Sequence, residues 1–271
     1  MKKTLQIWII LVLFLFLFPV IINYLPDGGA GAATTTKLIL KEPSQIVYAE
    51  NITEEDIPEI ITLTPTPKAL LYFTHSHEAY EPVTKAKSGK VAVSHQSENI
   101  MKFGEKLKTQ LIFNGIETDI LPIDNQLEMQ KNGIAYGRSY KEIRPHVAKQ
   151  IQEENYDLVI DLHRDHLGPD RTTVVFEDEN YAKIAFVVGM DHPNYAQNKA
   201  MAQQMKDELE LLVPGITRHL IMKGGARVDG KYNQDLGTSF LLIELGGIGN
   251  SEDELNRTIS VIAKAASKVV D

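Results

Sequence analysis

Three apolar segments that run into ionisable side chains constrain the fold of this chain more than any other feature. They are LLYFTHSHE, LVIDLHRD and LLIELGG, which begin at residues 70, 158 and 241. Short apolar runs of this kind are typical of strands that are buried on both faces of a parallel sheet. Because parallel strands place their carboxyl ends at the same edge of a sheet, we expect His75, His163 and Glu244 to converge there.

The rest of the chain from residue 69 onward alternates between strand and helix patterns. Further strands are predicted at residues 116–123, 172–177 and 183–191, and helices at residues 97–113, 139–154, 195–212 and 252–269. Strands that alternate with helices indicate an α/β fold with a mostly parallel sheet flanked by helices. We therefore expect residues 69–271 to form a single catalytic domain, since about 200 residues suffice for one sizeable core.

The N-terminus carries a membrane signal. Lys2 and Lys3 precede an almost unbroken apolar run from Ile7 to Ile22, and about 20 apolar residues cross a bilayer. This length favours an uncleaved anchor at residues 1–25 over a cleaved signal, whose apolar part is about 7–15 residues long, although Ala-Gly-Ala at residues 30–32 offers a cleavage site. Because the lysines stay inside, we expect a single-pass protein of the cell membrane whose catalytic domain is extracytoplasmic.

Residues 26–68 have the composition of an extended linker. Glycine and threonine are frequent, no periodicity is visible, and the stretch TLTPTP follows at residues 62–67. Proline-rich segments of this kind are extended rather than packed. The linker would therefore separate the membrane anchor from the catalytic domain.

Charge and cysteine content exclude several function classes. The formal net charge is −8, and acidic and basic residues are interspersed. A nucleic-acid partner would call for a basic patch, so none is expected. The chain has no cysteine, which excludes disulfides and thiolate ligands. A metal would have to be held by His, Asp or Glu, and such ligands suit zinc.

The predicted strand ends offer the ligands of a catalytic zinc site, which consists of three protein ligands and one open position. His75 and His163 are two of them. The third is either Glu78, in an HxxE spacing with His75, or His95, which precedes the first long helix. His77 is a weaker candidate, because the direction of its side chain beyond the strand end is not fixed by strand alternation.

Glu244 is the candidate general base. A carboxylate within an apolar strand is costly unless it is paired or functional, and a metal-bound water needs a proton acceptor near it. Gly246 and Gly247 follow at once, and the small residues would leave room for a substrate backbone.

The chain resembles the stage II sporulation protein P family in six segments that lie in the family's order within residues 68–265. They are THSHEAYEP, SHQSENIMKFGEKL, VIDLHRD, IAFVVGMDHPNYAQN, KYNQDL and LLIELGGIGN. The resemblance implies the α/β fold of zinc-dependent N-acetylmuramoyl-L-alanine amidases, with a phosphorylase/hydrolase-like sheet. It also implies amidase and endopeptidase action on peptidoglycan during engulfment of the forespore, with partners that resemble stage II sporulation proteins D and M.

The resemblance also bears on single residues. The family motif usually begins with His-Thr-His, and Phe73 stands where its first histidine would be. Glu78 and His95 both match family positions, so both remain candidates for the third ligand. Arg164 or Asn233 would hold the anionic or amide parts of a peptidoglycan stem peptide.

Two other functions compete with the amidase. A zinc carboxypeptidase-like or deacylating hydrolase also uses HxxE with a later His, and it would need a basic residue to bind a terminal carboxylate. A degenerate amidase domain that only binds cell wall is suggested by Phe73, whereas the retained His75, His163 and Glu244 favour catalysis.

Overall fold

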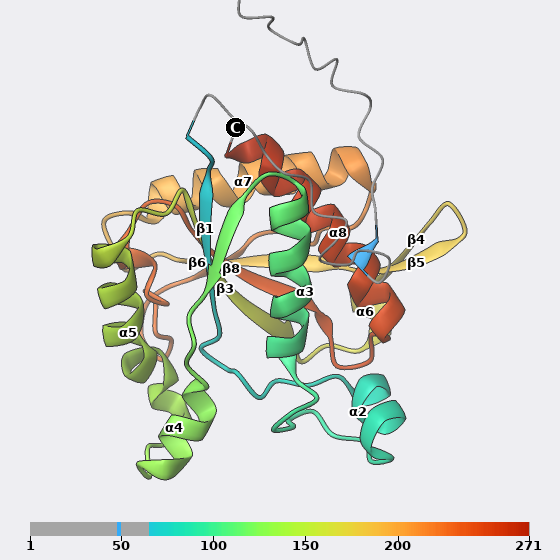
Figure 1. The fold of residues 1–271 in the computed structure, drawn as a ribbon, viewed down its shortest axis with the longest axis horizontal. Coiled ribbons are helices and arrows are strands. Elements are labelled where there is room, and N and C mark those ends of the chain that lie inside the picture. The colour runs from blue at the N-terminus through green and yellow to red at the C-terminus, as the bar shows by residue number, and fades with distance from the viewer. Residues whose placement is uncertain (1–47, 50–64, 271) are drawn as a thin grey trace, which may run out of the picture. The chain divides into compact units, whose positions relative to one another are not determined.

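A six-stranded sheet forms the centre of the computed structural model, which describes residues 48–49 and 65–270 (Figure 1). Its strand order is β2-β1-β3-β8-β6-β7. The strands are β1 (Lys68–Tyr72), β2 (Glu117–Ile120), β3 (Leu158–Asp165), β6 (Ile184–Gly189), β7 (Ile221–Lys223) and β8 (Phe240–Gly247). The predicted anchor and nearly all of the predicted linker lie outside the described residues. Within residues 48–49 and 65–270, no helix is both long and apolar enough to cross a membrane.

The sheet is mostly parallel, as predicted. β1 pairs in parallel with β2 and β3, β3 with β8, and β6 with β7. Within the described part of the chain, β6 and β8 are the one neighbouring pair of this sheet that runs antiparallel. The carboxyl ends of β1, β3 and β8 therefore share one edge, and the register of β3 and β8 sets His163 opposite Glu244.

Helices cover both faces of this sheet (Figure 1). They are α2 (Glu81–Ser88), α3 (Ile100–Phe113), α4 (Asn125–Lys131), α5 (Ser139–Glu153), α6 (Pro169–Thr172), α7 (Tyr195–Leu212) and α8 (Glu252–Val269). Successive side chains of a strand point to opposite faces, so Leu71 packs in the cluster with α3, α7 and α8, while Leu70 and Tyr72 pack in the cluster with α5. Each such buried side chain stabilises the fold by about 1.5–3 kcal/mol.

Some elements differ from the sequence prediction. The strand predicted at residues 172–177 does not join the sheet but forms a hairpin of β4 (Thr173–Phe176) with β5 (Glu179–Ala182). Its turn places Glu177 and Asp178 at positive φ, the backbone that a tight hairpin requires. The short helices α2 and α4 and the edge strand β7 were not predicted, because they are too short to show a clear period.

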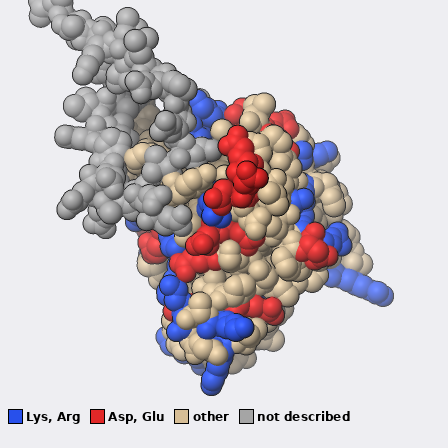
Figure 2. All heavy atoms as spheres, turned by 90° about the vertical axis from the view of Figure 1, so that its right-hand side faces the viewer, with Lys and Arg blue, Asp and Glu red and all other residues tan. Residues whose placement is uncertain are grey.

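The surface view shows how charge is distributed on one side of the molecule. Asp and Glu side chains lie among Lys and Arg side chains on this face (Figure 2). An ion pair joins α8 to the hairpin, where Arg257 Nη2 lies 2.5 Å from Glu179 Oε2.

Candidate metal and active site

The shared strand edge brings His75 and His163 into contact. His75 lies in the turn that follows β1, and His163 lies near the end of β3. The centroids of the two imidazoles are 5.1 Å apart, and the rings are nearly perpendicular at 83°. Two residues 88 positions apart in the sequence thus face one another as the parallel sheet predicted.

His75 is enclosed by aromatic side chains. Tyr136 stacks on its imidazole with ring centroids 4.4 Å apart and an angle of 13°, and Tyr140 meets it edge-on at 5.6 Å. Its Nδ1 atom is buried without a hydrogen-bond partner. Burial, aided by the charge of His163, lowers the pKa of His75 to about 3. The imidazole is therefore neutral at pH 7, which is the form that binds metals.

His163 lies between two carboxylates. Its Nδ1 is 3.7 Å from Oε2 of Glu78, and its Nε2 is 3.0 Å from Oδ1 of Asp161. Asp161 is itself fixed, because it accepts hydrogen bonds from the backbone N (3.0 Å) and Oγ1 (2.6 Å) of Thr74. Burial alone would lower the pKa of His163, but Asp161 and then Glu78 and Glu244 raise it to about 9. The ring is thus held between its neighbours, with Nδ1 directed to the Glu78 side.

Glu78 is joined to the same group by the turn after β1. Its backbone N donates to the carbonyl of His75 at 3.0 Å, and its Oε2 accepts from the backbone N of Arg164 at 2.7 Å. Burial raises the pKa of Glu78 although His163 and Arg164 act in the opposite direction. The turn and the strand end together place this carboxylate beside His163.

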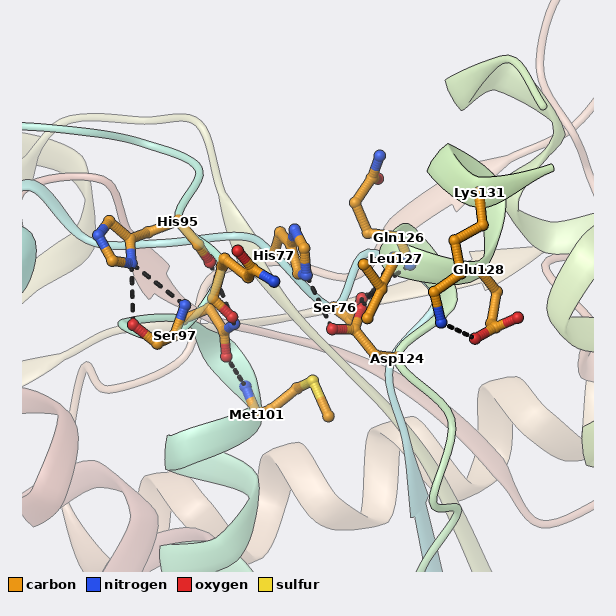
Figure 3. Close-up of polar contacts among 12 residues, drawn as sticks. Ser76, His77, His95, Ser97, Met101, Asp124, Gln126, Leu127, Glu128 and Lys131 are labelled. Carbon is orange, nitrogen blue, oxygen red and sulfur yellow. Dashed lines mark hydrogen bonds and ion pairs between the residues drawn. The ribbon is translucent and has the colours of Figure 1, made fainter. Parts of the chain in front are cut away.

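The side chain of His95, the rival third ligand, bonds within its own loop, while its backbone N donates to the carbonyl of His77 at 3.0 Å. Its Nδ1 accepts a hydrogen bond from the backbone N of Ser97 at 3.2 Å (Figure 3) and another from the backbone N of Glu98 at 2.9 Å, just ahead of α3. The structure therefore brings His75, Glu78 and His163 together and leaves His95 at the start of the helix. Which of Glu78 and His95 is a ligand stays a prediction, and the geometry favours Glu78.

Glu244 enters the site from β8, directly beside His163 on β3. Its Oε2 is buried and has no hydrogen-bond partner. Burial raises the pKa of Glu244 to about 7; the charge of His163 lowers it and that of Glu78 raises it. A carboxylate with a pKa near the working pH is suited to accept and return a proton.

The glycines after Glu244 do not leave space for a substrate. A Cβ on Gly247 would meet the carbonyl oxygen of Leu167 at 2.2 Å, and one on Gly246 would meet Oδ1 of Asn250 at 2.6 Å. The expectation of an open approach here was wrong, because the protein's own loops fill the room that the missing side chains provide.

A cavity of about 390 Å³ adjoins the candidate ligands. It is lined by His75, His77, Glu78, Val93, Ser94, Gln126, Tyr136 and Arg164. The guanidinium of Arg164 is largely committed, since Nη1 donates to the carbonyl of Asp165 (3.0 Å) and Nη2 to that of Val93 (2.9 Å). Its assignment as a substrate contact stays a prediction.

Asn233 does not line this cavity. Its Nδ2 donates to the carbonyl of Tyr140 at 2.9 Å, and its Oδ1 accepts from Arg144 at 3.1 Å. The amide thus ties its loop to α5 and holds Tyr232 edge-on against Tyr140 at 5.1 Å. A direct contact of Asn233 with substrate stays a prediction, while its role in positioning this loop is visible.

Sequence reasoning missed the tyrosines. Tyr140 stacks over His163 with centroids 6.1 Å apart, and Tyr136 covers His75 from the short helical turn ahead of α5. The sequence offered one signal: Tyr140 lies at the start of a predicted helix, and Tyr136 lies three residues ahead of that helix. Nothing there indicated that this helix begins at the site.

A family comparison identifies the chain. The model of the family described as stage II sporulation protein P (SpoIIP) matches residues 33–267. The chain belongs to this family. Stage II sporulation protein P of Bacillus subtilis (strain 168) is 32% identical over 200 residues, which are 73% of this chain and 50% of that protein. The chain therefore spans about half the length of this curated SpoIIP relative.

Solved structures are similar to this SpoIIP-family chain. The CwlD amidase from Clostridioides difficile, in complex with the GerS lipoprotein, has a TM-score of 0.50 at 17% identity and covers 75% of this chain and 98% of its own. A metallo-carboxypeptidase from Burkholderia cenocepacia has a TM-score of 0.46 at 13% identity, with 77% of this chain and 58% of that chain covered. The first likeness confirms an amidase-like α/β sheet with flanking helices.

The SpoIIP-family chain offers zinc donors that are close but not assembled. Within the described residues, no three His, Asp or Glu side chains lie close enough together to form a complete metal site. Their chemistry nevertheless fits, because His75 Nδ1 is buried and unpartnered and His163 Nδ1 faces Glu78. Two imidazoles and a carboxylate are a common set for catalytic zinc.

Proposed function

We propose that this SpoIIP-family protein is a zinc-dependent peptidoglycan hydrolase that cleaves the amide between the muramyl lactyl group and L-alanine. A second, endopeptidase activity on stem peptides belongs to the same proposal. One observation carries it: the partnerless Oε2 of Glu244, on a carboxyl with a pKa of about 7, adjoins His163 in the cluster with His75 and Glu78.

Three side chains would hold the metal, namely His75, Glu78 and His163. A bound zinc lowers the pKa of its water from about 15.7 to about 7 and polarises a carbonyl. Asp161 would keep the ring of His163 in place through the 3.0 Å contact at Nε2, which leaves Nδ1 for the metal. Tyr136 would fix the plane of the His75 imidazole by stacking.

Glu244 would move the proton. Its Oε2 would accept the proton of the attacking water and return it to the nitrogen of L-alanine as the amide breaks. The pKa near 7 suits both halves of this transfer, because the group is neither a strong acid nor permanently protonated. General acid–base help of this kind contributes about 10²–10⁴-fold in rate.

The buried position of Phe73 favours a catalytic domain over a degenerate one. It is 1% exposed and belongs to the core between β1 and α3, where a Cβ on Gly104 would meet its ring at 2.2 Å. The residue that replaces the family's first histidine therefore fills the core and removes no member of the cluster at His75.

The carboxypeptidase-like reading has less support. A terminal carboxylate is usually bound by two parallel N–H groups of an arginine. Both terminal nitrogens of Arg164 already donate to backbone carbonyls. One N–H of each terminal nitrogen is thus already used, and we therefore place an internal amide such as that of muramyl-L-alanine ahead of a terminal carboxylate.

The setting of the reaction belongs to the same proposal. The apolar N-terminal run, with its preceding lysines, would anchor the enzyme in the cell membrane and place its domain on the cell-wall side. Its partners during engulfment would be stage II sporulation proteins D and M.

Analysis of the cleaved ends tests the bond specificity. Purified peptidoglycan digested with the protein should gain free L-alanine amino groups and no new reducing sugar ends, as measured by amine labelling and mass spectrometry. New reducing ends without new amines would refute the proposal.

A further inference from the structure

A His–Asp pair on the cavity wall has no part in the mechanism proposed above. The Nε2 atom of His77 lies 2.9 Å from Oδ2 of Asp124, the N-cap residue of α4 (Figure 3). The other carboxylate oxygen, Oδ1, accepts from Ser76 Oγ at 2.6 Å and from the backbone N of Leu127 at 3.1 Å. The Asp124 carboxylate that holds His77 is itself fixed by two contacts. One comes from Ser76, in the same turn as His77, and the other from the N-terminus of α4.

These contacts determine which nitrogen of His77 carries the proton. Burial alone would raise the pKa of Asp124, but the bonds from Ser76, His77 and Leu127 hold it below its ordinary value. An ionised carboxylate only accepts hydrogen bonds, so Nε2 of His77 must be the donor. In the neutral imidazole, Nδ1 then carries a lone pair.

This lone pair belongs to a residue of the cavity wall and is not sealed from solvent. His77 lines the cavity together with His75 and Glu78. Among the described residues, Nδ1 has no hydrogen-bond partner, and it is not among the atoms sealed from solvent. His77 therefore offers the cavity one acceptor of fixed position.

We propose that His77 is a specificity-determining residue whose Nδ1 accepts a hydrogen bond from a peptide N–H of the substrate, with Asp124 as the positioning residue that fixes the tautomer. The inference rests on the proposed function, since it assumes that a peptide amide enters this cavity. Arg164 lies on the same wall, but an arginine side chain can only donate hydrogen bonds. Its two terminal nitrogens already donate to backbone carbonyls. His77 would thus meet the N–H groups of an extended stem peptide that would otherwise lose their water.

A site that accepts a substrate N–H discriminates against analogues that lack it, because its own polar group is then left unpaired. Loss of one such bond weakens binding by about 5–100-fold. The contact concerns binding, so the rate of the bound complex should change little.

Asp124→Asn isolates the tautomer. The side-chain oxygen can keep the bonds to Leu127 and Ser76, and Asn caps a helix as well as Asp does. Its amide N–H₂ takes the place of Oδ2 and donates to Nε2 of His77, which forces the proton onto Nδ1. Glu128→Gln is the matched control: it removes one charge from the same helix, and Glu128 pairs with Lys131 instead.

The first readout is the tautomer, measured by ¹⁵N NMR of the full chain with labelled histidine. The wild-type spectrum should show His77 protonated at Nε2, and the Asp124→Asn spectrum should show it protonated at Nδ1. Glu128→Gln should match the wild type. A wild-type His77 protonated at Nδ1 would overturn the proposal without any assay of activity.

The second readout is binding of N-acetylmuramoyl-L-alanyl-D-isoglutamine by calorimetry, in a Glu244→Gln background that does not turn the ligand over. Asp124→Asn and His77→Leu should each raise Kd by about 5–100-fold, with unchanged zinc content. Methylation of one peptide nitrogen of the ligand should weaken its binding to the background protein by a similar factor. The same methylation should not weaken binding to the Asp124→Asn variant any further. An unchanged Kd, or no binding to the background protein, overturns the proposal. Failure of the wild type to cleave peptidoglycan refutes the proposed function alone.

Discussion

Replacing Glu244 by Gln should abolish most activity and yet stabilise the fold at alkaline pH. The buried carboxyl has an ordinary pKa of 4.5 when unfolded and about 7 in the fold. A raised pKa means that the folded state disfavours the ionised form. The resulting loss in the free energy of unfolding is absent below pH 4.5, grows as the pH rises to 7, and is complete above 7.

The size of this effect follows from the two pKa values. A tenfold change in proton affinity is worth about 1.4 kcal/mol, so ionised Glu244 costs the metal-free fold about 3 kcal/mol at pH 8. Gln keeps the shape and cannot ionise. Glu244→Gln should therefore raise the free energy of unfolding by about 3 kcal/mol at pH 8 and by less than about 1 kcal/mol at pH 5.

Urea unfolding in the presence of EDTA at both pH values measures this difference. Peptidoglycan hydrolysis by the zinc-loaded variant should fall by about 10²–10⁴-fold. Glu128→Gln, which affects only an exposed pair with Lys131, should change stability by less than about 0.5 kcal/mol at either pH. A Glu244→Gln variant that is less stable than wild type at pH 8, or equally active, would refute the reasoning.

Further predictions concern the core, an ion pair and the topology. Gly104→Ala should destabilise the fold by about 1–3 kcal/mol in urea unfolding. The added Cβ would meet the Phe73 ring at 2.2 Å and would overpack the core. An unchanged unfolding midpoint would contradict this packing. Asp235→Asn should cost about 1 kcal/mol at pH 7 and less at pH 3, since the hydrogen bond from Arg144 lowers the pKa of Asp235 and this stability is lost as the pH falls through the folded pKa; an equal loss at both pH values would argue against the pair. Protease added to intact protoplasts should remove the large domain if residues 1–25 anchor it as proposed, whereas a protected domain would reverse the orientation.

The convergence of His75, His163 and Glu244 could be predicted because parallel strands leave little choice about where their carboxyl ends lie. The direction of β6 could not, since an apolar run such as IAFVVG reads the same in either direction. Nor could the exclusion of β4 from the sheet, which depends on the tight turn at Glu177 and Asp178.

The remainder of the site depends on contacts that no local pattern contains. Asp124 meets His77 across 47 positions of the chain, and Tyr136 reaches His75 from the turn before α5. The choice between Glu78 and His95 depended on the path of a loop: one turn directs Glu78 to His163, while His95 bonds to the amides ahead of α3.

Zinc stoichiometry of the purified protein, measured by elemental analysis on wild type and single variants, tests the central claim that the strand-edge cluster is a metal centre. The wild type should hold one zinc per chain. His75→Ala, His163→Ala and Glu78→Ala should each lose it, whereas His95→Ala and Glu244→Gln should keep it. Full zinc occupancy in His75→Ala and His163→Ala would contradict the account.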